Sequence, residues 1–239
     1  MTILTILQAR MTSSRLPGKV LKPVLGEPMM GRQIERLRRS RSLGRLVTAT
    51  STDPSDDAIV HYCATIGCPT YRGSLQDVLS RYAGALETFG PADHVVRLTA
   101  DCPLADWRVI DEVIALHLET GADYTSNTVD RSFPKGLDVE IFRAALLPEI
   151  AAATEDPYDR EHVTPFFYRN PDRFRIEQLV RPERHDEVRW TVDTPEDFAF
   201  ATAVYEALYP GKPAFDSDDI WTVEHAVRDD GVLRPGPSS

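Results

Sequence analysis

The sequence predicts an α/β protein in which helices cover both faces of a mostly parallel β-sheet. Short β-rich apolar runs alternate with amphipathic helix patterns through the first half of the chain, and several of these helix patterns stop at a glycine. Such alternation is typical of right-handed βαβ units stacked as three α/β/α layers. The 239 residues suffice for one domain with a full core, and no long linker divides them.

The first half supplies most of the expected alternation. Met29, Ile34 and Leu37 recur at helical spacing, while Ser55 is expected as a helix N-cap and Gly67 as a stop signal. We expect strands at 2–7, 45–51, 93–99 and 122–127, and helices at 28–40, 54–67, 76–90 and 106–121.

The second half changes character. The runs GLDVEIF and FRIEQLV alternate apolar and polar residues, as a strand with one exposed face does. We therefore expect strands at 136–142 and 174–180, and helices at 143–153, 159–168, 193–210 and near 218–228. A single domain should extend over residues 1–230, followed by a disordered tail at 231–239.

Charge and apolar patterning limit the class of protein. The formal net charge is −10, whereas binding along a nucleic-acid backbone usually needs a basic face, so we expect no nucleic-acid partner. No apolar run reaches membrane-spanning length and no signal-peptide pattern opens the chain, so we expect no membrane partner and a cytoplasmic location. Cys63, Cys68 and Cys102 are too few for a disulfide framework, and His61 beside the first two is not spaced like a zinc site, so we expect buried thiols.

A loop rich in cations follows the first expected strand. The run ILQARMTSSRLPGKV contains Arg10, Arg15 and Lys19, although the chain as a whole is acidic. Ligands of open α/β sheets bind beyond the carboxyl ends of the strands, where this loop should lie. Arginine forms forked bonds to phosphate oxygens, lysine acts as a point charge, and Ser13, Ser14 and backbone N–H groups can complete such a site. The loop predicts a phosphate-binding site, with a solvated basic loop as the alternative.

Two aspartates follow later apolar runs in a similar way. Asp101 comes after VVRLTA, and Asp193 comes after VRWTV and just before a Thr-Pro helix start. Each of them could instead cap a helix, and for either one alone the two interpretations are equally supported. Together with the cationic loop, two strand-end carboxylates suit a nucleotide bound with Mg²⁺, because this ion takes one or two carboxylates and fills its shell with water and phosphate oxygens. We therefore expect Mg²⁺ as the cofactor, held by Asp101 and Asp193.

Five motifs, read in order, resemble the cytidylyltransferase family, which includes the CMP-sialic-acid and CMP-KDO synthetases. They are QARMTSSRLPGKVL, RLTADCPL, GLDVE, REHVTPFFY and WTVDTPEDF, and they span about residues 3–200. The resemblance is closest to the branch of the spore coat polysaccharide biosynthesis protein F. It implies the nucleotide-diphospho-sugar transferase fold, which is GT-A-like. It also implies transfer of CMP from CTP to a sugar acid or related sugar acceptor, with release of pyrophosphate, in surface polysaccharide or glycan biosynthesis. We further expect a homodimer.

The resemblance assigns roles to the motif residues. Lys19, Arg15 and Asp101 would be catalytic, because they would neutralise the triphosphate and the leaving pyrophosphate, and Asp101 and Asp193 would be the Mg²⁺ ligands. One departure is Thr12, since the family usually has glycine near this position. The residues expected to bind the nucleotide are Gln8, Ala9, Arg10, Ser13, Ser14, Arg15, Lys19 and Arg97.

The acceptor is expected to contact the second half of the chain. Asp138 and Glu140 share one face of the expected strand by period-two alternation. Arg160 could bind an acceptor carboxylate or phosphate, and Gly136 and His162 complete the expected set. A half-exposed strand and a helix start with ordinary charges are the alternative interpretations. Residues 129–180 would form the acceptor-binding or dimerisation insertion of the domain.

Other functions share parts of this pattern. A sugar-1-phosphate nucleotidyltransferase or a molybdopterin guanylyltransferase would have a similar fold but a more glycine-rich first loop. A glycosyltransferase would usually carry an Asp-x-Asp motif after a strand, which the sequence lacks. A non-catalytic nucleotide-binding subunit is the alternative from another class, although the presence of both Asp101 and Asp193 favours catalysis.

Overall fold

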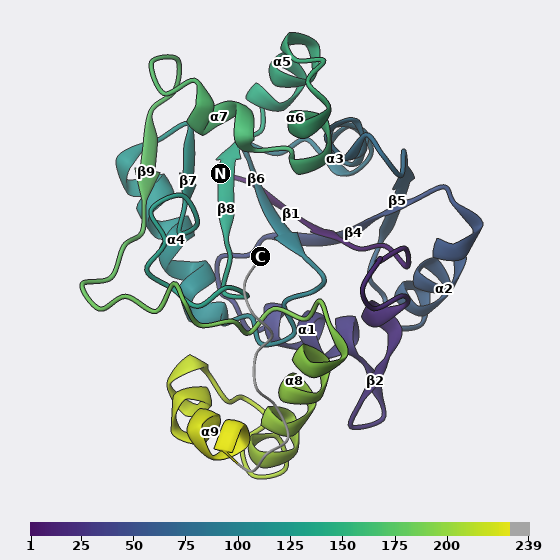
Figure 1. Ribbon diagram of the computed structural model, residues 1–239. Coiled ribbons are helices and arrows are strands. Elements are labelled where there is room, and N and C mark those ends of the chain that lie inside the picture. Colours follow the sequence, from purple (N-terminus) through teal and green to yellow (C-terminus); the bar gives the residue numbers. More distant parts are fainter. Residues whose placement is uncertain (230–239) are drawn as a thin grey trace.

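In the computed structural model, which describes residues 1–229, a seven-stranded sheet lies between layers of helices (Figure 1). The strand order across this sheet is β5-β4-β1-β6-β8-β7-β9, and a small hairpin, β2-β3, lies outside it. The strands are β1 (Ile3–Gln8), β2 (Pro23–Val24), β3 (Glu27–Pro28), β4 (Arg45–Ser51), β5 (Thr70–Gly73), β6 (His94–Thr99), β7 (Tyr124–Ser126), β8 (Glu140–Arg143) and β9 (Ile176–Gln178). The tail expected at 231–239 lies outside the described residues.

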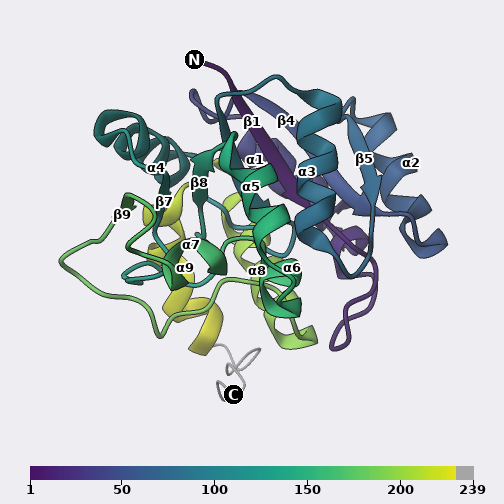
Figure 2. The same cartoon turned by 90° about the horizontal axis from the view of Figure 1, so that it is seen from above.

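Helices cover both faces of the sheet, as two orthogonal views show (Figures 1 and 2). One core cluster joins the sheet to α1, α2, α4, α8 and α9, and a second joins it to α3, α5 and α7. The α-helices are α1 (Met29–Leu37), α2 (Asp57–Thr65), α3 (Val78–Phe89), α4 (Trp107–Thr120), α5 (Leu146–Ala153), α6 (Pro157–His162), α7 (Pro165–Arg169), α8 (Pro195–Leu208) and α9 (Ser217–Asp229). Two 3₁₀ turns, η1 (Lys19–Leu21) and η2 (Pro54–Asp56), complete the elements.

The central strand β1 shows why the sheet needs two helical layers. Leu4 and Ile6 are buried in the cluster with α3 and α5, whereas Leu7 is buried in the cluster with α1 and α8. Alternate side chains of a strand point to opposite faces, so a strand that is apolar on both sides must be covered twice. The predicted three-layer α/β/α fold is confirmed.

The register places the ends of three strands together. β1 pairs in parallel with β4 and β6, so Gln8 lies opposite Ala49 on one side and Thr99 on the other. β8 runs antiparallel to both β6 and β7, which makes the sheet mostly rather than wholly parallel. The carboxyl ends of β1 and β6, and the loops that follow them, therefore lie side by side.

Several expected boundaries are wrong for local reasons. The strand expected at 136–142 begins only at Glu140, because Gly136 adopts a φ of 113° and the chain before β8 packs against residues 188–191. The helix expected at 159–168 is broken into α6 and α7, because Val163 has a φ of 71° and Pro165 lacks an N–H group. Strand β5 and the hairpin β2-β3 were not expected at all.

The expected helix at 54–67 opens as the 3₁₀ turn η2, and its cap is Asp53 rather than Ser55. The Asp53 carboxylate accepts a hydrogen bond from the Ser55 N–H over 2.8 Å. The sequence predicts the right region but the wrong capping side chain, because Pro54 occupies the first position of the turn and the residue before it is the cap.

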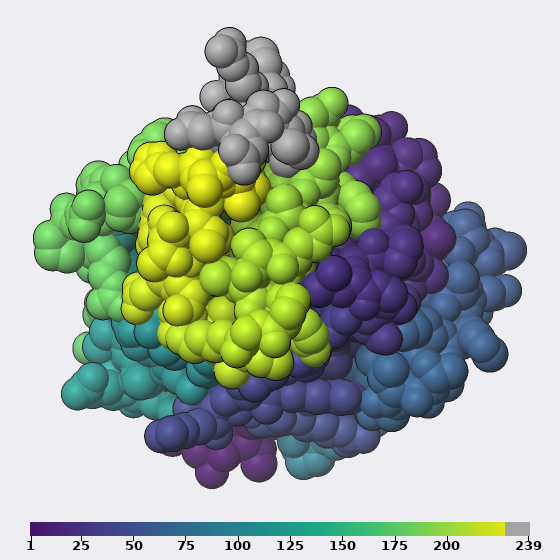
Figure 3. Space-filling model, turned by 90° about the horizontal axis from the view of Figure 1, so that it is seen from below, coloured from purple at the N-terminus to yellow at the C-terminus, as the bar shows by residue number. Residues whose placement is uncertain are grey.

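Helices α8 and α9 lie side by side on the face shown in Figure 3, next to N-terminal residues. The indole N–H of Trp190 donates to Glu224 of α9 over 3.1 Å, which ties this helix to the segment before α8. No helix within residues 1–229 is both long and apolar enough to cross a bilayer. Cys63, Cys68 and Cys102 are buried free thiols, as expected.

Candidate active site

A cavity of about 210 Å³ opens where the loops after β1 and β6 meet. It contains both predicted metal ligands and seven of the eight residues that the sequence predicted to bind nucleotide; Arg97 is the exception. The lining residues are Gln8, Ala9, Arg10, Ser13, Ser14, Arg15, Lys19, Val20, Thr99, Ala100, Asp101 and Asp193.

The loop after β1 is held in a fixed shape by the carbonyl and N–H groups of Met11. Gly18, with a φ of 70°, donates its N–H to the Met11 carbonyl oxygen over 2.9 Å. The Met11 N–H donates to the buried Asp56 carboxylate over 2.7 Å, and Asp56 also accepts from Thr50 and Ser51. Sequence reasoning missed Asp56, because the carboxylate acts on a loop 45 residues earlier in the chain.

The same loop leaves donors available at its tip. Within the described residues, the backbone N–H groups of Ser14 and Arg15 donate to no protein acceptor. The Arg15 side chain is 55% exposed, and its guanidinium lies 3.0 Å from the Asp193 carboxylate. Backbone N–H groups beside an arginine are a typical arrangement for binding phosphate oxygens.

Lys19 lines the cavity and contacts both aspartates. Its ammonium group donates to the Val192 carbonyl oxygen over 2.7 Å and to Asp193 Oδ1 over 2.8 Å, and it lies 3.4 Å from Asp101 Oδ2. The Lys19 side chain is only 9% exposed. Three acceptors from two parts of the chain, the loop after β6 and the segment before α8, thus converge on one buried cation.

Asp193 is surrounded by cations. Burial alone would raise the pKa of its carboxyl group, but Lys19, Arg15 and Arg189 together hold that pKa below its ordinary value. Arg189 donates to Asp193 over 2.7 Å and also to Asp197 over 3.0 Å. Sequence reasoning missed Arg189, although a cation four residues before an aspartate is a visible signal.

Neither Asp101 nor Asp193, the two predicted metal ligands, caps a helix. Helix α8 is capped by Thr194, which forms a reciprocal capping box with Asp197. Helix α4 is capped by Asp106, five residues beyond Asp101. The helix-cap interpretation that the sequence left open for both residues is therefore wrong: Asp101 and Asp193 line the cavity, and other residues cap the helices.

The two carboxylates offer oxygen ligands to a hard cation at one wall of the cavity. Within residues 1–229 no group of three or more acidic, histidine or cysteine side chains gathers in a way that could hold a metal ion by itself. However, Asp101 and Asp193 converge on one ammonium group, which shows that they can share a cation. Carboxylate oxygens suit Mg²⁺, which needs only one or two of them when phosphate and water supply the rest.

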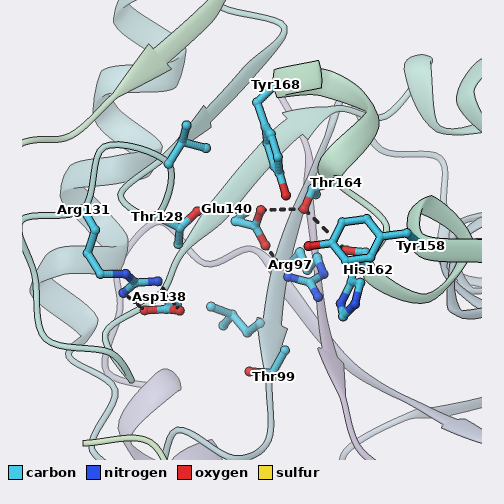
Figure 4. Close-up of a pocket in the computed structure, with 12 residues that line it drawn as sticks. Arg97, Thr99, Thr128, Arg131, Asp138, Glu140, Tyr158, His162, Thr164 and Tyr168 are labelled. Atoms are coloured by element: carbon cyan, nitrogen blue, oxygen red, sulfur yellow. Dashed lines mark hydrogen bonds and ion pairs between the residues drawn. The ribbon is translucent and has the colours of Figure 1, made fainter. Parts of the chain in front are cut away.

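A second cavity, of about 510 Å³, adjoins the first at Thr99 (Figure 4). Arg97 and Glu140 form an ion pair in its wall, and Glu140 also accepts hydrogen bonds from Tyr124 and Thr164, each over 2.6 Å. Burial would lower the pKa of Arg97, but the Glu140 carboxylate beside it raises that pKa above its ordinary value. Arg97 therefore lies in the larger cavity rather than beside the cationic loop.

Two groups of side chains face each other across this cavity. On one side Arg131 donates two hydrogen bonds to Asp138, over 2.6 and 2.9 Å, and on the other the rings of Tyr158 and His162 lie 4.4 Å apart (Figure 4). Of the expected acceptor contacts, Asp138, Glu140 and His162 are thus brought together. Tyr168 also lines this cavity. The sequence showed an aromatic-rich segment there but did not single out Tyr168.

The other two expected acceptor residues lie elsewhere. Arg160 donates to the carbonyl oxygens of Thr154 and Ala151 and to the Asp77 carboxylate, and it lines a separate hollow. Gly136 lies against the backbone of the segment that leads to Asp193, where a Cβ atom would come within 2.7 Å of the Thr191 nitrogen.

Curated relatives cover most of the chain. The spore coat polysaccharide biosynthesis protein SpsF of Bacillus subtilis is 37% identical over 212 residues, which are 85% of this chain and 86% of SpsF. An uncharacterized protein of Methanocaldococcus jannaschii is 36% identical over 200 residues, covering 83% and 81%. A 3-deoxy-manno-octulosonate cytidylyltransferase of Syntrophobacter fumaroxidans is 30% identical over 241 residues, covering 82% and 94%.

Solved structures share the fold. A cytidylyltransferase from Leptospira borgpetersenii superposes with a TM-score of 0.90 and 29% identity, over 100% of this chain and 99% of that one. A CMP:2-keto-3-deoxy-manno-octonic acid synthetase complexed with CTP gives a TM-score of 0.64 at 16% identity, over 87% and 99%. A Mycobacterium tuberculosis protein solved with manganese gives 0.57 at 15% identity, over 83% and 96%.

The fold is that of the nucleotidyltransferases, with a mostly parallel sheet between helical layers. A sequence profile of the cytidylyltransferases matches residues 4–210. The chain belongs to the cytidylyltransferase family.

Proposed function

We propose that this protein transfers CMP from CTP to a sugar acid or a related sugar acceptor and releases pyrophosphate, in the synthesis of a surface polysaccharide or glycan. The observation that carries the proposal is the pair of adjoining cavities. One holds phosphate-type donors and two carboxylates, and the other is large enough for a sugar. The names of the relatives point to the same chemistry, because one is a spore coat polysaccharide protein and another a sugar-acid cytidylyltransferase.

The smaller cavity supplies the groups that a nucleoside triphosphate needs. Arg15 and the open N–H groups of Ser14 and Arg15 can bind phosphate oxygens at the mouth of the cavity. Asp101 and Asp193 would hold Mg²⁺, which when bound would neutralise charge on the reacting phosphate oxygens. The manganese-bound relative of the same fold is consistent with a divalent cation at such a site.

The larger cavity supplies a binding surface for the acceptor. Thr128, Asp138 and the Arg131 side chain offer hydrogen-bonding groups to hydroxyls, whereas Tyr158 and Tyr168 offer ring faces and edges. Mixed polar and aromatic linings of this kind fix the orientation of a small ligand. An acceptor bound there would point toward Thr99, where the two cavities meet.

The reaction then follows from positioning. An acceptor oxygen, whose proton passes to solvent, attacks the α-phosphorus. A new P–O bond forms, and the bond from the α-phosphorus to the bridging oxygen of the β-phosphate breaks. Pyrophosphate leaves with that oxygen and its electron pair. In phosphoryl transfer most of the catalysis comes from alignment and charge neutralisation, and here the side chains of Arg15 and Lys19 provide the positive charge. The homodimer, the insertion at 129–180 and the cytoplasmic location expected from the sequence remain predictions.

The decisive experiment is a matrix of the four nucleoside triphosphates against sugar acids and sugar phosphates, with Mg²⁺ and pyrophosphate release as the readout. We expect release with CTP and a sugar acid or related sugar, and loss of this signal in Asp101→Asn. Equal release from ATP or GTP would contradict the cytidylyl assignment. Release only with a sugar 1-phosphate would favour a sugar-1-phosphate nucleotidyltransferase, and no release with any pair would favour a non-catalytic subunit.

A further inference from the structure

We propose that Lys19 is a built-in counter-ion for the aspartate pair, which keeps Asp101 and Asp193 from binding a divalent cation until a nucleotide is present. The inference deepens the proposed function and rests on it for the identity of the nucleotide. In the nucleotide-free protein Lys19 would thus act on the metal site through the two aspartates. This role is separate from any contact that Lys19 makes with phosphate once a nucleotide is bound.

The hydrogen bonds of Lys19 carry the first step. An ammonium group has three N–H donors. In the structure three acceptors surround Lys19 Nζ: the carbonyl oxygen of Val192, the carboxylate of Asp193 and the carboxylate of Asp101. No donor is left for a phosphate oxygen in this arrangement. Lys19 must release at least one of these acceptors before it can contact a nucleotide.

Burial and charge carry the second step. The Lys19 side chain is 9% exposed, so water does not screen its ammonium group from its surroundings well. A divalent cation shared by Asp101 and Asp193 would lie next to this ammonium group and would be repelled by it. Arg15 and Arg189 also engage Asp193 from other sides, at 3.0 and 2.7 Å. The acid pair is therefore already neutralised, and a metal ion by itself gains little there.

The third step is the route by which a nucleotide changes this balance. The main chain at Lys19 is held in η1, where its N–H donates to the Leu16 carbonyl oxygen over 3.2 Å. The four-carbon stem of lysine is flexible, so the ammonium group can move while the backbone stays. A triphosphate beside Arg15 would offer the ammonium group new acceptors and would offset the positive charge. Metal and nucleotide should then bind with positive coupling.

The test measures metal binding without any nucleotide. Mn²⁺ is titrated into wild type, Lys19→Met and Lys19→Arg, and free Mn²⁺ is followed by electron paramagnetic resonance. We expect Lys19→Met to bind one Mn²⁺ at least about tenfold more tightly than wild type, because the variant lacks the ammonium group that contacts both carboxylates. Arg15 and Arg189 remain, but they contact only Asp193 of the pair. Lys19→Arg, which keeps the charge, should stay as weak as wild type.

A double variant locates the effect. Lys19→Met combined with Asp193→Asn should lose the added affinity, because one of the two carboxylates no longer carries charge. Equal Mn²⁺ affinity in wild type and Lys19→Met would overturn the proposal. Tight binding that survives Asp193→Asn would overturn it as well, because the ion would then occupy another place.

Thermal unfolding separates this result from a folding defect. Lys19→Met leaves two carboxylates facing each other, so its melting temperature should be lower without metal and should rise on addition of Mn²⁺ more than that of wild type. Lys19→Gln serves as a second, polar variant if Lys19→Met does not fold, with the same expected order. Pyrophosphate release by wild type is assayed separately, so failure of the cytidylyltransferase assignment would leave the Mn²⁺ comparison interpretable.

Discussion

Val192 donates its main-chain N–H to the main-chain carbonyl oxygen of Asp101 over 2.8 Å. This bond ties the chain just before Asp193 to the loop after β6, and the hydroxyl of Thr191 adds a second bond to the same oxygen over 3.2 Å. The two carboxylates are thereby kept close enough to share Lys19. A main-chain bond and a hydroxyl bond to one carbonyl oxygen thus hold the two segments that carry the acid pair together.

Removing either charge of the acid pair should abolish most turnover. Asp101→Asn and Asp193→Asn keep the side-chain volume, so the folded structure should persist while Mg²⁺ binding with CTP weakens. We expect kcat to fall by at least about a hundredfold in each, since the lost charge stabilisation amounts to several kcal/mol. Steady-state pyrophosphate release at varied Mg²⁺ measures this. Asp218→Asn, at a 79% exposed carboxylate on α9, is the matched control and should retain activity.

Loss of the exposed cation at the loop tip should weaken nucleotide use without unfolding the protein. Arg15→Ala removes a charge-assisted phosphate contact worth roughly 1.5–3 kcal/mol, so kcat/KM for CTP should fall by about ten- to a hundredfold. Arg41→Ala, on another exposed loop, is the control for loss of one positive charge. If the two variants behave alike with CTP, the loop after β1 is not the phosphate site.

The stability of the fold around the larger cavity should depend on the buried carboxylate of Glu140. Glu140 accepts from Arg97, Tyr124 and Thr164, so Glu140→Gln leaves the Arg97 charge buried without its partner. Breaking a buried pair typically costs about 3–5 kcal/mol, and urea unfolding should show a loss of this order. Glu149→Gln, on the exposed side of α5, should change stability very little. A small effect in both variants would mean that Glu140 is free to serve the acceptor.

The free energy of unfolding should fall in mild acid because of a histidine pair between β6 and α4. His117 is buried, and its Nε2 atom lies 2.9 Å from Nδ1 of His94. Burial, followed by the charges of His94 and Arg143, lowers the pKa of His117 to about 4. As the pH falls below 6.5, the ordinary pKa of histidine, His117 is therefore protonated in the unfolded chain before it is protonated in the folded protein. The stability that the neutral ring provides is complete above that value and is lost between pH 6.5 and about 4.

Urea unfolding of wild type at about pH 7 and about pH 5 should differ by roughly 2 kcal/mol from this group. His117→Gln removes the titrating ring, so its unfolding free energy should depend less on pH over the same interval. An unchanged pH dependence in His117→Gln would assign the acid sensitivity to other groups.

The sequence by itself determined the layers of the fold and most of the smaller cavity. Apolar runs that alternate with amphipathic helices leave few arrangements other than a covered parallel sheet, and a loop that follows a parallel strand must lie at one edge of that sheet. The loop from Gln8 to Lys19 and Asp101 could therefore be placed together without a structure. Asp193 was expected at the end of a strand, but it lies in the segment between β9 and α8, and the main-chain bond from Val192 to Asp101 brings it to this edge. The boundaries near Gly136 and Val163 could not be placed from the sequence, because unusual backbone angles there depend on contacts with distant segments.

Only the tertiary structure decided what each charged group faces. Asp56 holds the loop after β1, Arg97 pairs with Glu140 across two antiparallel strands, and Arg160 joins α6 to the ends of α5 and α3. The three donors of Lys19 are occupied by acceptors that lie 82 to 174 residues away from it in the sequence. Spacing along the chain shows which side chains can reach one edge of a sheet. The partner of each charge is set by packing between segments, because hydrogen bonds and ion pairs act over a few ångströms.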